Sequence, residues 1–77
     1  QDRLFESTQL AQQAIDGAKN DLEKARYTHT LGWIYHLQGH RDQAITTLEE
    51  AVALATVEEN VIYGEILQDL EKIKAEE

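Results

Sequence analysis

The sequence predicts an all-α fold in which about four helices form antiparallel hairpins. The chain of 77 residues contains no proline, and its polar residues are mostly Gln, Glu, Lys and Asp, which favour helices over strands. Apolar residues recur at steps of three and four, as on one face of a helix. The linkers are short, so consecutive helices must lie antiparallel and side by side. This length allows one small domain, residues 1–77.

The first helix is expected from about Asp2 to Lys19. Its apolar positions are Leu4, Ala11, Ala14, Ile15 and Ala18. The segment "KND" at residues 19–21 ends it, because Asn20 tolerates the left-handed backbone conformation. Asp21 is then expected to cap the second helix, since its carboxylate can accept hydrogen bonds from free backbone N–H groups.

The second helix is expected from about Leu22 to Gln38, and it stops at Gly39. The residues expected to pack between helices are Tyr27, Leu31, Ile34 and Tyr35. Either His40 or Asp42 opens the third helix.

The third helix continues to about Thr56. Its apolar face comprises Ala44, Ile45, Leu48, Ala51, Val52 and Ala55. Asn60 can cap a last helix over residues 60–76. The apolar positions of that helix are Ile62, Ile66, Leu70 and Ile73.

Composition restricts the classes of partner. Fifteen acidic residues against seven basic ones give a formal charge of −8, which repels phosphate backbones, so no nucleic acid is expected. The longest apolar run, residues 51–55, is far below the roughly 20 residues of a membrane span. The absence of cysteine excludes disulfides and cysteine-ligated zinc. With no signal-peptide pattern in "QDRLFESTQL", we expect a cytoplasmic protein.

The sequence repeats itself with a period of 32 to 33 residues. Three positions of the first helix recur in the third, with Ala11, Ile15 and Ala18 matched by Ala44, Leu48 and Ala51. "LGWIY" at residues 31–35 recurs as "YGEIL" at residues 63–67, so that Gly64 corresponds to Gly32. Two types of helix therefore alternate along the chain.

These residues resemble the tetratricopeptide repeat, a helix–turn–helix unit of about 34 residues. The matching positions are Leu31, Gly32, Tyr35, Gly39, Ala44, Leu48 and Ala51. The resemblance implies one full repeat over residues 22–56, a preceding half-repeat over residues 2–19, a capping helix over residues 60–76, and stacking into a short right-handed superhelix. The chain departs from the family pattern at Thr28, Leu48 and Thr56.

Small residues are expected where two helices cross closely, because a larger side chain would force the axes apart. Gly32, Ala44 and Ala51 are the expected crossing points, with larger residues filling the space around them. Each of the other glycines is attributed to a helix end or a crossing.

No assembled catalytic, cofactor or metal site is evident from the sequence. One ion cannot reach both His29 and His36, which lie about 10 Å apart along a helix, and Gly39 interrupts the helix between His36 and His40. No third ligand has the spacing of a metal site. The carboxylates belong to solvated faces and helix ends, and nothing resembling a nucleophilic triad surrounds Ser7, the only serine. We therefore expect no enzyme, no cofactor and no metal.

The family resemblance implies a peptide-binding or helix-binding surface on the inner face of the first helix of each unit. In the full repeat this face comprises Arg26, His29, Thr30, Trp33, His36 and Leu37. We expect Trp33 to be the main anchor, because tryptophan is enriched among residues that dominate interfaces; the alternative is that it fills space against the first helix. Family members that clamp a terminal carboxylate use Lys and Asn where this chain has His29 and Trp33, which disfavours that ligand class.

The last helix has a different inner face, in which acidic and apolar residues alternate. Its residues are Glu58, Val61, Ile62, Glu65, Gln68 and Asp69. Together with the net charge, this face predicts a protein or peptide partner with basic residues beside an apolar anchor.

The sequence therefore predicts a non-catalytic protein–protein interaction module, a scaffold or adaptor. The alternative is a terminal, regulatory or oligomerisation segment of a larger multidomain protein, and a small helical enzyme dependent on His36 or Glu65 is the third hypothesis.

Self-association is expected through the first helix, because stacked repeats bury their apolar faces only against neighbours. The face concerned carries Leu4, Phe5, Leu10 and Ile15. A homodimer with a two-fold contact, or an exchange of helices, would cover it.

Overall fold

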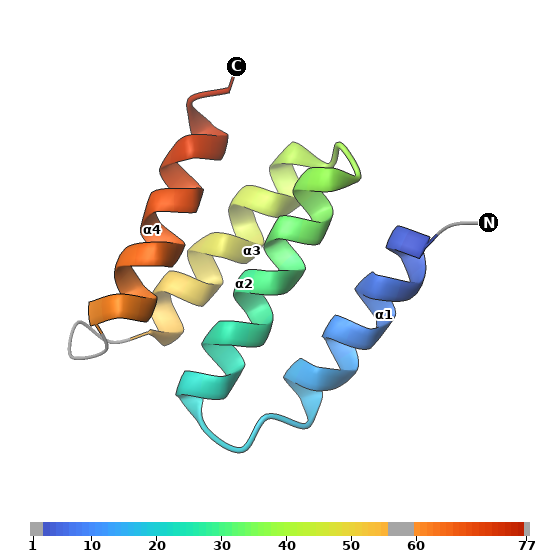
Figure 1. Cartoon of the computed structure of the whole chain (residues 1–77), viewed down its shortest axis with the longest axis vertical. Coiled ribbons are helices and arrows are strands. Elements are labelled where there is room, and N and C mark those ends of the chain that lie inside the picture. The colour runs from blue at the N-terminus through green and yellow to red at the C-terminus, as the bar shows by residue number, and fades with distance from the viewer. Residues whose placement is uncertain (1–2, 56–59, 77) are drawn as a thin grey trace.

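The computed structural model describes residues 3–55 and 60–76. Its elements are four α-helices, α1 (Arg3–Asp16), α2 (Asp21–Leu37), α3 (Arg41–Leu54) and α4 (Asn60–Lys74). Consecutive helices run antiparallel, and α1 and α4 lie on opposite sides of the α2–α3 hairpin (Figure 1). The all-α prediction is confirmed.

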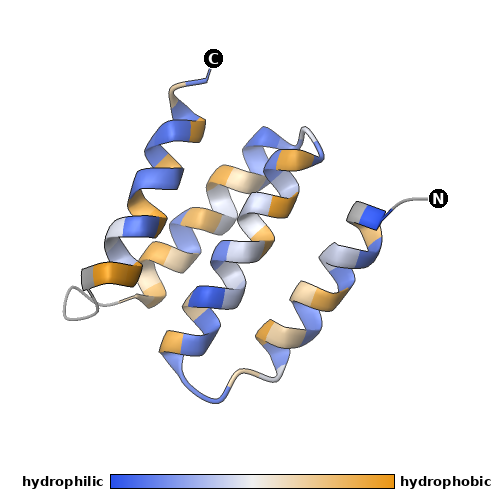
Figure 2. Ribbon diagram, viewed as in Figure 1, coloured by the Kyte–Doolittle hydropathy of each residue, from blue (hydrophilic) through white to orange (hydrophobic). Residues whose placement is uncertain are grey.

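The molecule is flat, measuring 40 × 32 × 15 Å. The helix α2 contacts all three other helices, most extensively α3, whereas α1 contacts only α2 within the described part of the chain. Hydrophobic and hydrophilic residues are mixed along all four helices (Figure 2), and α1 and α4 gather their apolar residues on one face, as amphipathic helices do. None of the described helices has the length and apolar character needed to cross a membrane.

The start of α2 differs from the prediction. Asn20 is the residue that caps this helix, and its backbone is extended (φ −157°) rather than left-handed. Its side-chain oxygen accepts a hydrogen bond from the backbone N–H of Glu23 at 2.9 Å. Asp21 is the first helical residue and places its negative charge in the first turn, where the helix dipole favours it.

The end of α1 also lies earlier than predicted, at Asp16 instead of Lys19. The N–H of Gly17 still bonds four residues back, to the carbonyl of Gln13 at 3.0 Å. The next N–H, that of Ala18, bonds only three residues back, which tightens and ends the helix.

The turn from α2 to α3 confirms the predicted stop at Gly39, whose φ of +83° is in the left-handed region. The N–H of Gly39 bonds to the carbonyl of His36 at 3.0 Å, and the N–H of His40 to that of Tyr35 at 2.9 Å. This pair of bonds is the Schellman arrangement that closes a helix. His40 precedes α3 without a side-chain capping bond.

The helix α3 ends at Leu54, and the predicted end at Thr56 lies outside the described residues. Asn60, which was expected to cap the last helix from outside, is instead the first residue of α4.

The hydrophobic core lies between α2, α3 and α4. Its members are Ala25, Ala44, Leu48, Ala51, Ala55, Ile66, Leu70 and Ile73. Among residues 5–16 of α1, Ala11 is the only buried hydrophobic. Tyr27, which was expected between helices, lines a hollow between α1 and α2 and keeps 37% of its surface exposed.

The close crossing of α2 and α3 is confirmed at Gly32. A β-carbon placed there would lie 2.6 Å from Cδ2 of Leu48 and 3.5 Å from the carbonyl oxygen of Ala44. Leu48, Ala44 and Ala51 are fully buried. The corresponding Gly64 of α4 does not lie at a crossing, because a β-carbon there would meet nothing within 4 Å among the described residues. In the described structure, no other helix lies against Gly64 itself.

Candidate functional site

A surface pocket lies where α2 passes beside α4. Three α2 residues, His29, Thr30 and Trp33, line it together with Asp69 of α4. The pocket has a volume of ≈ 270 Å³. Four residues that the sequence assigned to partner binding are thus brought together, although one of them is 36 or more positions from the others in the sequence.

A histidine–carboxylate contact joins two residues that line this pocket. Nε2 of His29 lies 2.7 Å from Oδ2 of Asp69, a hydrogen-bond distance. The two side chains are 23% and 33% exposed, so solvent reaches both. Sequence reasoning placed both residues on binding faces but missed that they bond to each other, because no spacing rule relates positions 40 residues apart.

Trp33 is partly buried and packs against the hydrophobic core. Its ring lies 4.9 Å from the ring of His36, tilted by 41°. Nε2 of His36 is 3.7 Å from Oε1 of Glu76, which is too long for a hydrogen bond. Trp33 therefore lines a pocket shared with α4, and it is partly buried, as in the alternative in which it fills space.

The remaining predicted residues do not line this pocket. Arg26 is exposed on α2, and its carbonyl accepts a hydrogen bond at 3.2 Å from the hydroxyl of Thr30, which does line the pocket. Glu65 and Gln68 are exposed on α4. Of the other residues expected on the inner face of α4, Val61 is exposed, Ile62 is partly buried, and Glu58 lies outside the described residues.

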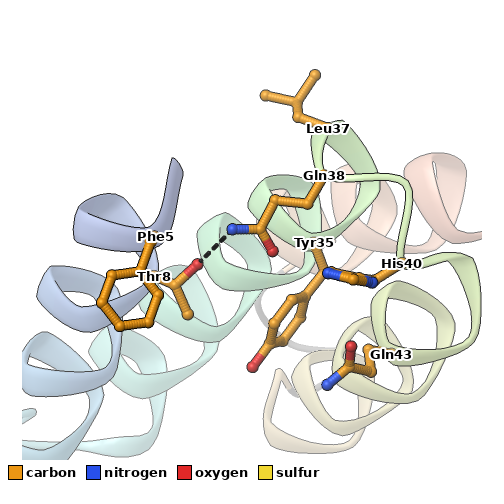
Figure 3. A pocket seen from close by; sticks show the side chains of 7 residues that line it. All are labelled: Phe5, Thr8, Tyr35, Leu37, Gln38, His40 and Gln43. Atoms are coloured by element: carbon orange, nitrogen blue, oxygen red, sulfur yellow. Dashed lines mark hydrogen bonds between the residues drawn. The ribbon is translucent and has the colours of Figure 1, made fainter. Parts of the chain in front are cut away.

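A second pocket, of ≈ 510 Å³, lies between α1, the end of α2 and the start of α3 (Figure 3). It is lined by Phe5, Thr8, Tyr35, Leu37, Gln38, His40 and Gln43. Nε2 of Gln38 donates to Oγ1 of Thr8 at 3.1 Å across the pocket. Leu37 thus lines a different pocket from the other α2 residues that the sequence grouped with it. Sequence reasoning did not find this pocket, because its walls come from three helices.

Among residues 3–55 and 60–76, no group of three or more His, Asp or Glu side chains is placed to hold a metal ion. In comparisons with known proteins, no family model, no curated protein and no solved structure matches the chain.

Proposed function

We propose that this chain is a non-catalytic protein–protein interaction module that binds a peptide or a helix on the surface between α2 and α4. The observation that carries the proposal is the pocket in which the partly buried Trp33 lies next to Asp69. A large aromatic surface beside a carboxylate is the kind of site that anchors a partner.

The partner that this surface favours carries a basic residue next to an apolar anchor. Trp33 supplies an aromatic ring for the anchor or for cation–π contact. Asp69 and Glu65 lie four residues apart on α4 and supply negative charge at the same side. The formal charge of −8 attracts a basic segment over a longer range.

The proposal includes a tetratricopeptide-like stacking of the helices in a right-handed superhelix. It is supported by the recurrence of the sequence after 32 to 33 residues and by the close packing of Gly32 on Leu48. A cytoplasmic location is part of the proposal, and the absence of cysteine favours it.

Selection from a random peptide library displayed on phage tests this function. We expect the chain to enrich peptides that contain Lys or Arg near a large apolar residue. Trp33→Ala should weaken binding of a selected peptide at least tenfold, about 1.4 kcal/mol or more, as expected for a central aromatic anchor.

Two further variants separate binding from folding. Asp69→Asn keeps the shape of the side chain and should weaken binding of basic peptides. Glu49→Gln makes the same change of charge at an exposed position of α3 and should leave binding unchanged. The proposal is wrong if no peptide is enriched, or if selected peptides bind the Trp33→Ala and Asp69→Asn variants as tightly as the parent.

A further inference from the structure

The most exposed large hydrophobic side chains lie toward the two ends of the helix array. Val61 on α4 is 71% exposed, and Leu10 and Phe5 on α1 are 65% and 56% exposed. Leu37, at the end of α2, lines the pocket of Figure 3 and is 57% exposed. Solvent-exposed positions do not require apolar side chains, so the exposure of these residues calls for an explanation.

The internal repeat relates these two ends to one another. A residue of α2 corresponds to the residue 32 positions later in α4, and a residue of α1 to the residue 33 positions later in α3. Within the chain, α2 packs on α3 in the most extensive helix contact of the described structure. The α2-like helix α4 lacks a partner of the α3 type, and the α3-like helix α1 lacks a partner of the α2 type, within the described residues.

The closest contact of the α2–α3 pair has an open counterpart on α4. Gly32 lies against Leu48 within the chain, and the corresponding residues are Gly64 and Ile15. A β-carbon at Gly64 would meet nothing within 4 Å in the described structure, and Ile15 is only partly buried. If α4 of one copy packed on α1 of a second copy, Gly64 would receive Ile15.

Other contacts map onto the exposed apolar side chains. The repeat register matches the hydrogen-bonded pair of His29 and Asp69 with the pair of Val61 and Leu37. Both of these residues are exposed in a single chain and would meet each other between two copies.

The environment of Tyr35 maps in the same way. Tyr35 lies with Gln43 and Thr47 at one pocket of the α2–α3 pair. Its counterpart on α4 is Leu67, which would lie against the second copy's Leu10 and Ala14, the counterparts of those two polar residues. The other two α3 residues of this pocket, Asp42 and Thr46, have the polar counterparts Gln9 and Gln13. The repeat register thus places Leu67 opposite Leu10 and Ala14, with glutamines beside them.

Opposite charges lie at the two turns that would meet, and each turn also carries one charge of the other sign, Glu71 on α4 and Arg3 on α1. The last turn of α4 carries Lys72 and Lys74, and the first turn of α1 carries Glu6. Antiparallel packing like that of α2 on α3 would bring these two turns together. The helix lengths agree as well. The last residue of α2, Leu37, corresponds to Asp69, and α4 continues for five residues beyond Asp69. The first residue of α3, Arg41, corresponds to Thr8, and α1 begins five residues before Thr8.

We propose that copies of this chain associate head to tail, with α4 of one copy packed on α1 and the end of α2 of the next. The two surfaces differ, so the contact is heterologous and leaves a free surface at each end. Association therefore continues beyond a dimer and completes a repeat at each junction.

Two variants block one surface each. Leu10→Glu places a charge on α1 and Val61→Glu places one on α4, and both side chains are exposed, so the fold of each chain is retained. Thr46→Glu is the control, since it adds the same charge at an exposed position of α3, a helix that belongs to neither surface.

Sedimentation velocity over a concentration series gives the result. The parent and Thr46→Glu should form species larger than two chains, each blocked variant alone should be monomeric, and an equal mixture of the two variants should form a dimer with one copy of each. This recovery arises because each variant retains the surface that the other has lost.

Three outcomes would overturn the proposal. A monomeric parent at every concentration would show that the exposed surfaces do not associate. A parent that stops at a dimer, lost in Leu10→Glu but kept in Val61→Glu, would show a two-fold contact through α1. Blocked variants with native circular dichroism that stay monomeric when mixed would show that the two surfaces are not complementary.

Discussion

Identical residues at equivalent repeat positions have different surroundings in this molecule. Gly32 faces Cγ and Cδ2 of Leu48, at 2.7 and 2.6 Å from a β-carbon placed on the glycine. Leu48 is fully buried, so its side chain has no space into which to move. Gly64 faces open space. The same substitution should therefore have opposite effects on stability at the two positions.

Replacing each glycine by alanine tests this difference. Gly32→Ala should lower the free energy of unfolding by about 1–3 kcal/mol through overpacking, reduced by the better helix propensity of alanine. Gly64→Ala should raise it by up to about 1 kcal/mol, because only the propensity changes. Urea midpoints, measured at a protein concentration where the chain is monomeric, give both values. Equal shifts for the two variants would contradict the crossing of α2 and α3 at Gly32.

The sequence predicted single residues well where their environment is local or repeated. The left-handed stop at Gly39 follows from the chemistry of glycine, and the crossing at Gly32 follows from the repeat. The hydrogen bonds of His29 with Asp69 and of Gln38 with Thr8 were not predicted. They join residues 40 and 30 positions apart, and their formation depends on how helices pack rather than on spacing along the chain.

The number and order of the helices were predictable because periodicity is a local signal. The ends of the helices were less predictable, and the start of α2 shows why. Asn20 and Asp21 are adjacent residues that both favour the capping position, and composition alone does not choose between them. The cap is Asn20, which accepts a hydrogen bond from the N–H of Glu23. In a second hydrogen bond, of 3.1 Å, Oε1 of Glu23 accepts from the N–H of Lys19.

Substituting the two candidate caps by alanine tests this assignment. Asn20→Ala removes the acceptor for the N–H of Glu23 and should cost about 1 kcal/mol of stability. Asp21→Ala removes only a charge from the first turn and should cost about 0.3–1 kcal/mol at low ionic strength. Salt should reduce the second effect and leave the first. A larger loss for Asp21→Ala than for Asn20→Ala in urea unfolding would show that the cap is misassigned.

At the scale of the whole molecule, the core and the candidate site belong to the same three helices. The core lies between α2, α3 and α4, and the pocket of Trp33 and Asp69 opens on the surface of α2 and α4. The helix α1 is attached through α2 alone. Stability should therefore be lowest in α1 and highest in α3.

Amide hydrogen exchange measures this gradient. We expect the amides of α1 to exchange fastest among the helices and those of α3 slowest, because α1 can open without exposing the core. Uniform protection across all four helices would contradict this attachment of α1.

The central claim is that a partner binds between α2 and α4, and Trp33 is a built-in reporter because it is the only tryptophan in the chain. The direct measurement is the fluorescence emission of Trp33 during titration with a peptide selected from the library, beside an independent measurement of affinity by calorimetry. We predict a saturable change in emission with the same dissociation constant as the calorimetric one. Tight binding in the calorimeter with no change in the emission of Trp33 would place the peptide elsewhere and contradict the claim.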